Sequence, residues 1–287
     1  MRAVLTSPRV RLPDAERDRH ATWLELFYDL AVVVGVAQAA QLLAAGVAAQ
    51  PLAMFGWFFV TFWWVWGSHT VYATRFDTDD AVYRLLTLTQ MFALLLMAAF
   101  TTSAEAGQSS AFGVAYVLAR LCQLALLARA HYHLPSVRAV TGRTLVGFCL
   151  ALCVWLAGLL DTSTARIVLW SASLAIDLFV PWWVRARAAM AVGPSHLPER
   201  LGLFTIIVLG EALVRGIGEA NSLLAGALGG ATGFSVMAAI WWLYFRHLER
   251  TIGRLHLATP QPYIYAHLPV HLAIVLTGVA IERAMHG

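Results

Sequence analysis

Ionisable side chains occur inside segments that are otherwise apolar, and these residues are where chemistry could take place. The segment from His196 to Arg215 runs through apolar residues to Glu211, which lies about 18 Å beyond Glu199 along an α-helix. If this helix crosses a bilayer, the Glu211 carboxylate costs about 2.5–3.5 kcal/mol unless it is paired, protonated or hydrated. Glu211 is therefore a candidate proton, ion or substrate site. A neutral glutamate hydrogen-bonded to a second helix is the structural alternative.

An arginine lies near the middle of another apolar segment. An unpaired guanidinium at that depth is implausible, so Arg120 needs a carboxylate partner. The candidates are Glu211, Asp177 and Asp29, and we predict an Arg120–Glu211 pair at the narrow end of a polar cavity. Asp177 precedes Pro181 by four residues, and a proline there can kink the helix and free a backbone carbonyl.

Further carboxylates and histidines fall at a similar depth in the apolar segments. Glu25 and Asp29 are four residues apart and share a helix face. His267 and His271 have the same spacing, which can bind a metal ion, although packing or hydrogen bonding explains an isolated pair as well. We predict that these residues line a water-accessible cavity open to the cytoplasm. The predicted ion, proton or substrate pathway comprises Glu25, Asp29, His69, Asp177, Arg120, Glu211, His267 and His271.

An acidic loop, RFDTDDAVYR, follows the second apolar segment. One interpretation is a helix N-cap with acidic residues favoured by the helix dipole. The other is a Mg²⁺ and diphosphate site, in which Asp77 and Asp80 would be the metal ligands. In both cases the loop belongs to a cytoplasmic mouth, whose predicted residues are Arg75, Asp77, Asp79, Asp80, Arg84, Glu199 and Arg200.

The composition indicates an integral membrane protein. The chain has 287 residues, of which 60% are hydrophobic and 13% charged, whereas soluble domains carry about 25% charged residues. With about 20 apolar residues per span, we predict an all-α, polytopic transmembrane helical bundle of about nine spans. Residues 1–22 form an Arg-rich cytoplasmic tail, and 23–287 a single membrane domain. The expected spans are 23–45, 51–74, 81–103, 111–130, 141–160, 163–184, 197–218, 224–246 and 263–285.

The arginines predict the orientation of this bundle. All twenty basic residues are arginine, and sixteen of them fall in the tail and in alternate loops on one side. Three fall on the other side, and Arg120 lies within a span. This asymmetry predicts a cytoplasmic N-terminus and an outer C-terminus. The arginines occupy short loops rather than one soluble face, so no nucleic-acid partner is expected.

Two short matches suggest an internal repeat. Residues 24–27 resemble 201–204, and Trp63-Trp64 with His69 resembles Trp241-Trp242 with His247. Both matches pair spans that run in the same direction. A parallel repeat of spans one to three and seven to nine is therefore one hypothesis, and coincidence is the other.

Three stretches resemble the low temperature requirement A (LtrA) family of bacterial membrane proteins. They are TWLELFYDLAVVVGVAQ, WWVWGSHTVYATRFDTDDAVYRLLTLTQM and HLPERLGLFTIIVLGEALV, and YAHLPVHLAIVLTGVAIE agrees less specifically. The resemblance implies a multi-pass protein of the bacterial inner membrane, but no established biochemical activity. Members are often longer, so we expect a short member or part of a longer one.

The ionisable cluster favours a proton- or ion-coupled transporter or permeation protein, whose partners are the bilayer and a small ion. The alternative is an intramembrane enzyme acting on a small apolar, lipid or isoprenoid diphosphate substrate through acidic residues. A structural or sensory membrane protein is a third possibility. No cofactor is predicted for a transporter, and Mg²⁺ is expected only for the enzyme. The oligomeric state is not readable from the sequence.

Overall fold

The computed structural model describes residues 6–10, 21–43, 46, 48–105, 110–161, 164–184, 196–217, 223–248 and 261–286. Most of the predicted Arg-rich tail, including residues 11–20, therefore lies outside the described residues. Within the described part, nine helices have eighteen residues or more, and each overlaps one predicted span. They are α1 (Trp23–Ala40), α2 (Ala49–Arg75), α3 (Ala81–Ala99), α5 (Ser110–His133), α6 (Arg138–Leu159), α7 (Ala165–Val184), α8 (His196–Ile217), α9 (Leu223–Leu243) and α11 (Gln261–His286).

Short elements connect these helices. They are the strands β1 (Arg9–Val10) and β2 (Phe76–Asp77), the helix α4 (Thr101–Glu105), the 3-10 turns Gln41–Leu43 and Pro135–Val137, and a π-turn at Tyr244–Leu248. The two strands pair antiparallel, with Arg9 opposite Asp77 and Val10 opposite Phe76. The all-α prediction is confirmed, because this pair is the one sheet in the described residues.

Seven helices in the described residues are long and apolar enough to cross a membrane. The α2 and α8 helices are not among the seven. The α2 helix is rich in tryptophan, and α8 carries Arg200, Glu211 and Arg215. The total of about nine spans and the orientation stay predictions. We call the end at which α1 begins the inner end.

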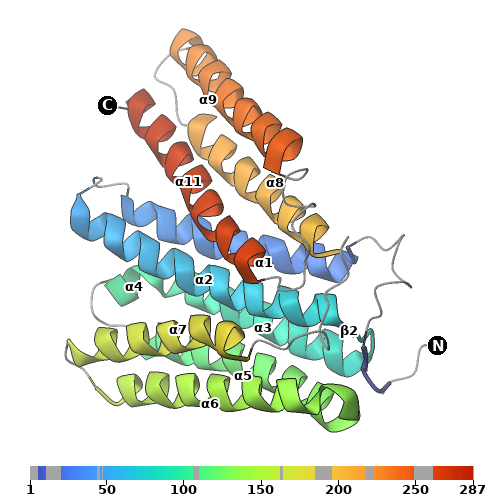
Figure 1. Cartoon of the computed structure of the whole chain (residues 1–287). Helices are drawn as coiled ribbons and strands as arrows, with labels where there is room; N and C mark the ends of the chain where they lie inside the picture. Colours follow the sequence, from blue (N-terminus) through green and yellow to red (C-terminus); the bar gives the residue numbers. More distant parts are fainter. Residues whose placement is uncertain are drawn as a thin grey trace.

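The helices form two groups that meet at α1 and α2 (Figure 1). The first group contains α1 to α7, which run side by side. The second group contains α8, α9 and α11, which are inclined to the first in Figure 1. The α1 helix packs against α2, α3 and α8, and α2 also contacts α5, α8 and α11. The α1 and α2 helices therefore join the two groups.

Local hydrogen bonds fix where two of the helices begin. Thr22 and Glu25 form a capping box, in which the Thr22 N–H donates to Glu25 Oε2 (2.7 Å) and the Glu25 N–H donates to Thr22 Oγ1 (3.3 Å). Asp80 caps α3 by accepting a hydrogen bond from the Tyr83 N–H at 2.9 Å. The N-cap interpretation of the acidic loop is therefore confirmed for Asp80.

Close helix contacts occur where a glycine faces another helix. A Cβ at Gly278 of α11 would lie 2.8 Å from the Ala212 backbone of α8, and one at Gly35 of α1 would lie 2.4 Å from the Phe62 ring of α2. Gly230 of α9 makes no such contact, because a Cβ there would have no atom of another residue within 4 Å.

The repeat hypothesis stays a prediction. The first helix of each triplet packs against the other two: α1 against α2 and α3, and α8 against α9 and α11. The matched tryptophans lie in different environments, because Trp63 and Trp64 are buried whereas Trp241 and Trp242 are exposed.

Candidate functional site

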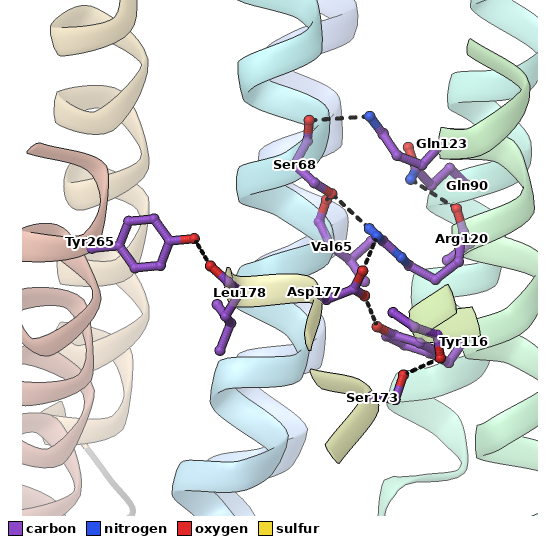
Figure 2. A network of polar contacts seen from close by, with 12 residues as sticks. Val65, Ser68, Gln90, Tyr116, Arg120, Gln123, Ser173, Asp177, Leu178 and Tyr265 are labelled. Atoms are coloured by element: carbon purple, nitrogen blue, oxygen red, sulfur yellow. Dashed lines mark hydrogen bonds and ion pairs between the residues drawn. The ribbon is translucent and has the colours of Figure 1, made fainter. Parts of the chain in front are cut away.

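Arg120 forms a buried ion pair with Asp177 (Figure 2). Its Nη2 lies 2.7 Å from Asp177 Oδ1, and its Nη1 donates to Ser68 Oγ at 3.1 Å. The Tyr116 hydroxyl donates to Asp177 Oδ2 at 2.9 Å, and the guanidinium carbon lies 4.4 Å from the centre of the Phe148 ring. The Arg120–Asp177 pair is thus held by side chains from α2, α5, α6 and α7.

Glu211 does not pair with Arg120, so that prediction is wrong. Glu211 Oε1 lies 2.9 Å from Nε of Arg215, one turn further along α8. Arg215 also lies 3.6 Å from Glu282 of α11. The reason is the helix order: α8 packs against α1, α2, α9 and α11, whereas Arg120 reaches α2 and α7.

A second buried ion pair joins Arg200 to Asp29. Arg200 Nη1 donates to Asp29 Oδ2 at 2.9 Å, and Nη2 donates to Oδ1 at 2.7 Å, which is the bidentate geometry that arginine forms best. Trp66 Nε1 donates to the same Oδ1 at 2.8 Å. We predicted Arg200 at the mouth, but its side chain has no exposed surface. The carboxylate of the neighbouring Glu199 is not part of this pair and accepts a hydrogen bond from the Ala21 N–H.

His69 lies next to this pair in a cluster that we call the His69 niche. The niche comprises His69, Tyr28, Tyr83, Thr87 and Gln90. The Tyr28 ring stacks on the imidazole with centroids 4.2 Å apart, and the Tyr83 ring lies 6.2 Å away on a nearly parallel plane. His69 is fully buried, the Gln90 side chain lies close enough to act on its imidazole, and neither ring nitrogen has a partner at hydrogen-bond geometry in the described part of the chain.

Hydrogen bonds to protein groups occupy both ring nitrogens of His271. Trp63 Nε1 lies 3.2 Å from Nδ1, and because an indole N–H can only donate, Nδ1 accepts. The proton therefore sits on Nε2, 2.9 Å from Thr205 Oγ1, whose own proton goes to the Leu201 carbonyl. His271 is thereby assigned as a neutral imidazole.

The same reasoning assigns His267. Its Nδ1 lies 2.8 Å from the Tyr263 carbonyl oxygen and donates to it, so Nε2 accepts from the Tyr244 hydroxyl at 2.9 Å. Hydrogen bonding thus explains the His267–His271 spacing. The described residues contain no group of three histidine, cysteine or acidic side chains placed to hold a metal ion.

The acidic loop is held by an arginine that we did not single out. Asp80 accepts hydrogen bonds from Arg129 Nη1 (2.9 Å), the Thr6 N–H (3.0 Å) and the Tyr83 N–H. Burial of Asp80 opposes its ionisation, but the Arg129 and backbone hydrogen bonds outweigh burial and lower the pKa of Asp80 to about 2. Asp80 is thus a permanent anion at neutral pH.

The remaining residues of the predicted mouth contribute to the same structure. Asp79 pairs with Arg84 at 2.8 Å on the surface, and Asp77 belongs to β2. We call the segment Thr6–Val10, which contacts Asp80, Arg129 and β2, the N-terminal clip. Arg75, the last residue of α2, directly precedes β2.

The structure thus divides the predicted site residues among several clusters. Asp29 lies with Arg200, His69 lies beside them, and Glu25 acts electrostatically on His69. Asp177 and Arg120 form a separate cluster, and Glu211 lies further along α8. Polar residues within apolar segments were a sequence signal for most of the members that we missed, although Tyr83 and Arg129 lie near helix ends. Those members are Tyr28, Ser68, Tyr83, Thr87, Gln90, Tyr116, Gln123, Arg129 and Thr205.

Comparisons with known proteins agree with the resemblance seen in the sequence. A family model described as bacterial low temperature requirement A protein (LtrA) matches residues 20–287. The chain is 28% identical over 288 residues to an uncharacterised protein of Rhizobium meliloti (strain 1021). That match covers 92% of this chain and 69% of the relative. No solved structure matches.

Proposed function

Because the chain belongs to the bacterial low temperature requirement A (LtrA) family, whose description names no reaction, we propose a function from its buried polar residues. The protein is a membrane protein that moves protons or a small ion along α8. Ionisable residues inside membrane helices are costly, and they commonly mark ion pathways and proton relays.

The observation that carries this proposal is a series of polar contacts along one helix. The inner contact is the buried Arg200–Asp29 pair, and the outer one is the partly exposed Glu211–Arg215 pair. Between them, Thr205 meets His271 at 2.9 Å. All three contacts involve α8 and extend from its first turn to its last.

The spacing of these contacts determines what a pathway would require. At ~1.5 Å per helical residue, Thr205 lies about 7.5 Å beyond Arg200, and Glu211 lies about 9 Å beyond Thr205. These gaps exceed the length of a hydrogen bond. Transfer along α8 therefore requires water molecules or side-chain movement between the contacts, as in a gated relay.

The enzyme alternative has less support from the geometry. In that reading, Asp77 and Asp80 would hold Mg²⁺ and a diphosphate. Asp80 already accepts hydrogen bonds from Arg129 and two backbone N–H groups, and Asp79 is paired with Arg84. A metal ion at Asp80 would have to displace Arg129.

The test measures proton flux into liposomes that contain the purified chain and a pH-sensitive dye. We expect Asp29→Asn and Glu211→Gln each to lower the flux at least ten-fold, because each removes a charge from the series. Asp79→Asn is the matched control, since that carboxylate is on the surface, and it should leave the flux unchanged. Equal proton flux in protein-free and protein-containing liposomes, under both a pH gradient and a membrane potential, would exclude proton movement by the protein.

A further inference from the structure

We propose that the His69 niche is an internal water-binding site, where a small group of water molecules bonds the imidazole and the polar groups around it. The niche lies beside the contacts along α8 and is not one of them. The inference therefore goes beyond the proposed function, and it holds whether or not the protein carries ions.

Unpartnered polar atoms of the niche come from three helices. They are the Tyr28 hydroxyl on α1, both ring nitrogens of His69 on α2, and Thr87 Oγ1 and Gln90 Oε1 on α3. Tyr83, Thr87 and Gln90 lie on one face of α3 because they are spaced four and three residues apart. That face is directed at His69, as the near-parallel Tyr83 and His69 rings show.

Leaving these buried polar atoms without hydrogen-bond partners would destabilise the folded protein. Each buried donor or acceptor that loses water without a replacement costs about 1–3 kcal/mol. Buried polar groups in folded proteins are nearly always satisfied by protein or by ordered water. In the Arg120–Asp177 pair, protein groups bond both Asp177 oxygens and both Arg120 Nη atoms, and Gln123 Oε1 is a single unpartnered amide oxygen near them. The His69 niche, with five such atoms from four side chains that are each almost wholly buried, needs another source of hydrogen bonds.

The chemistry of the niche selects a neutral ligand that both donates and accepts. A neutral imidazole offers one donor and one acceptor, a hydroxyl offers both, and an amide oxygen only accepts. Of the charges nearest the niche, Arg200 and Asp29 neutralise each other in their bidentate pair, and the Glu25 carboxylate, which acts on His69, is bonded by the Thr22 N–H in the capping box. Water satisfies all of these groups, and a buried water typically has two to four polar partners.

Magnetic resonance of the full chain in lipid bilayers tests the proposal directly. With ¹⁵N-labelled histidine, magnetisation transfer from water should reach the His69 nitrogens several-fold more strongly than those of His267 and His271. Those two rings are internal controls because protein groups occupy their nitrogens. The signal that disappears in His69→Phe identifies the residue. Transfer no stronger than at His271, or a direct bond to the Gln90 amide in its place, would overturn the inference.

A second measurement uses the sign of a stability change. Thr87→Val replaces a hydroxyl by a methyl group of similar shape. If water bonds that hydroxyl, the substitution lowers the melting temperature and also weakens the water transfer to His69, whereas a lower melting temperature with unchanged transfer would overturn the inference by indicating a bond to Tyr83 instead. If the niche is dry, the substitution removes an unsatisfied group and raises the melting temperature. Thr61→Val is the control, because Thr61 is equally buried but bonds the Trp57 carbonyl at 2.8 Å, and it should leave the His69 signal unchanged.

Discussion

Two arginine–aspartate pairs of the same chemistry lie on opposite sides of α2, and they differ in what surrounds them. Arg120 and Asp177 are enclosed by Ser68, Tyr116 and Phe148, and both Asp177 oxygens and both Arg120 Nη atoms have hydrogen-bond partners. The Arg200–Asp29 pair adjoins the His69 niche instead, and Arg200 Nε itself has no hydrogen-bond partner there.

The difference separates a structural pair from a candidate functional one. A buried pair whose remaining hydrogen bonds all go to protein groups fixes helix positions, and rearranging it would break several bonds at once. A pair bordered by unsatisfied groups can exchange partners with water at lower cost. We therefore choose the candidate functional pair by the state of its neighbours and not by its depth in the membrane. The following substitutions test this distinction.

Removing one member of the enclosed pair should have the largest effect. Arg120→Met leaves the Asp177 carboxylate buried without its cation, and we expect the free energy of unfolding to fall by about 3–5 kcal/mol. Chemical unfolding in mixed micelles measures this change. Adding Asp177→Leu should recover most of the loss, since an apolar pair replaces an ionic one. A double variant as unstable as Arg120→Met would contradict the structural role.

The matched substitution in the Arg200–Asp29 pair should lower the free energy of unfolding less and the proton flux more. Arg200→Met leaves Asp29 with its Trp66 hydrogen bond and next to a hydrated niche, so we expect a loss of about 1–3 kcal/mol. Proton flux in liposomes should fall at least ten-fold. If the two methionine variants lose equal stability, or if Arg120→Met alone abolishes flux, the comparison between the pairs fails.

A subtler change removes one hydrogen bond from the enclosed pair. Tyr116→Phe deletes the hydroxyl that donates to Asp177 and keeps the ring stacked on Trp155, whose centroid is 3.8 Å away. A hydrogen bond to a charged group contributes about 1.5–3 kcal/mol, so stability should fall by that amount. Flux per folded molecule should be unchanged, as measured in the same liposomes.

The smallest effect should appear at the N-terminal clip, as a dependence on pH. The pKa of Asp80 is lowered to about 2 in the folded protein, so the stability that its ionised form contributes is complete above pH 4 and is lost as the pH falls toward 2. Thermal unfolding of the wild type and of Asp80→Asn should therefore differ by up to about 2 kcal/mol at neutral pH and converge near pH 2. A constant difference across this range would show that Asp80 acts without its charge.

The sequence was sufficient for the helices but not for the partners of their charged residues. Long apolar segments located all nine helices, and the depth of Arg120 required a carboxylate, of which Asp177 was one candidate. The choice between Asp177 and Glu211 depends on which helices surround α2, and hydrophobic periodicity does not encode that order. Arg200 was misplaced because it starts an apolar segment and so looked like a boundary residue.

The histidines also show that the sequence does not determine the hydrogen-bond partners of polar residues. The His267–His271 spacing resembles a ligand pair, but Trp63, Thr205, Tyr244 and a backbone carbonyl take up the ring nitrogens. Three of those groups are on other helices, so only the packed structure assigns them. His69 has no motif around it, yet it is a buried histidine neither of whose nitrogens has a hydrogen-bond partner in the described residues.

The N-terminal clip also constrains how the chain is made. Thr6 bonds Arg129, which is 123 positions later near the end of α5, so the complete set of clip contacts can form only after α5 has been synthesised. The contacts of the clip with β2 and Asp80 involve residues that are made earlier. The bond to Arg129 is therefore the last contact of the clip that can form.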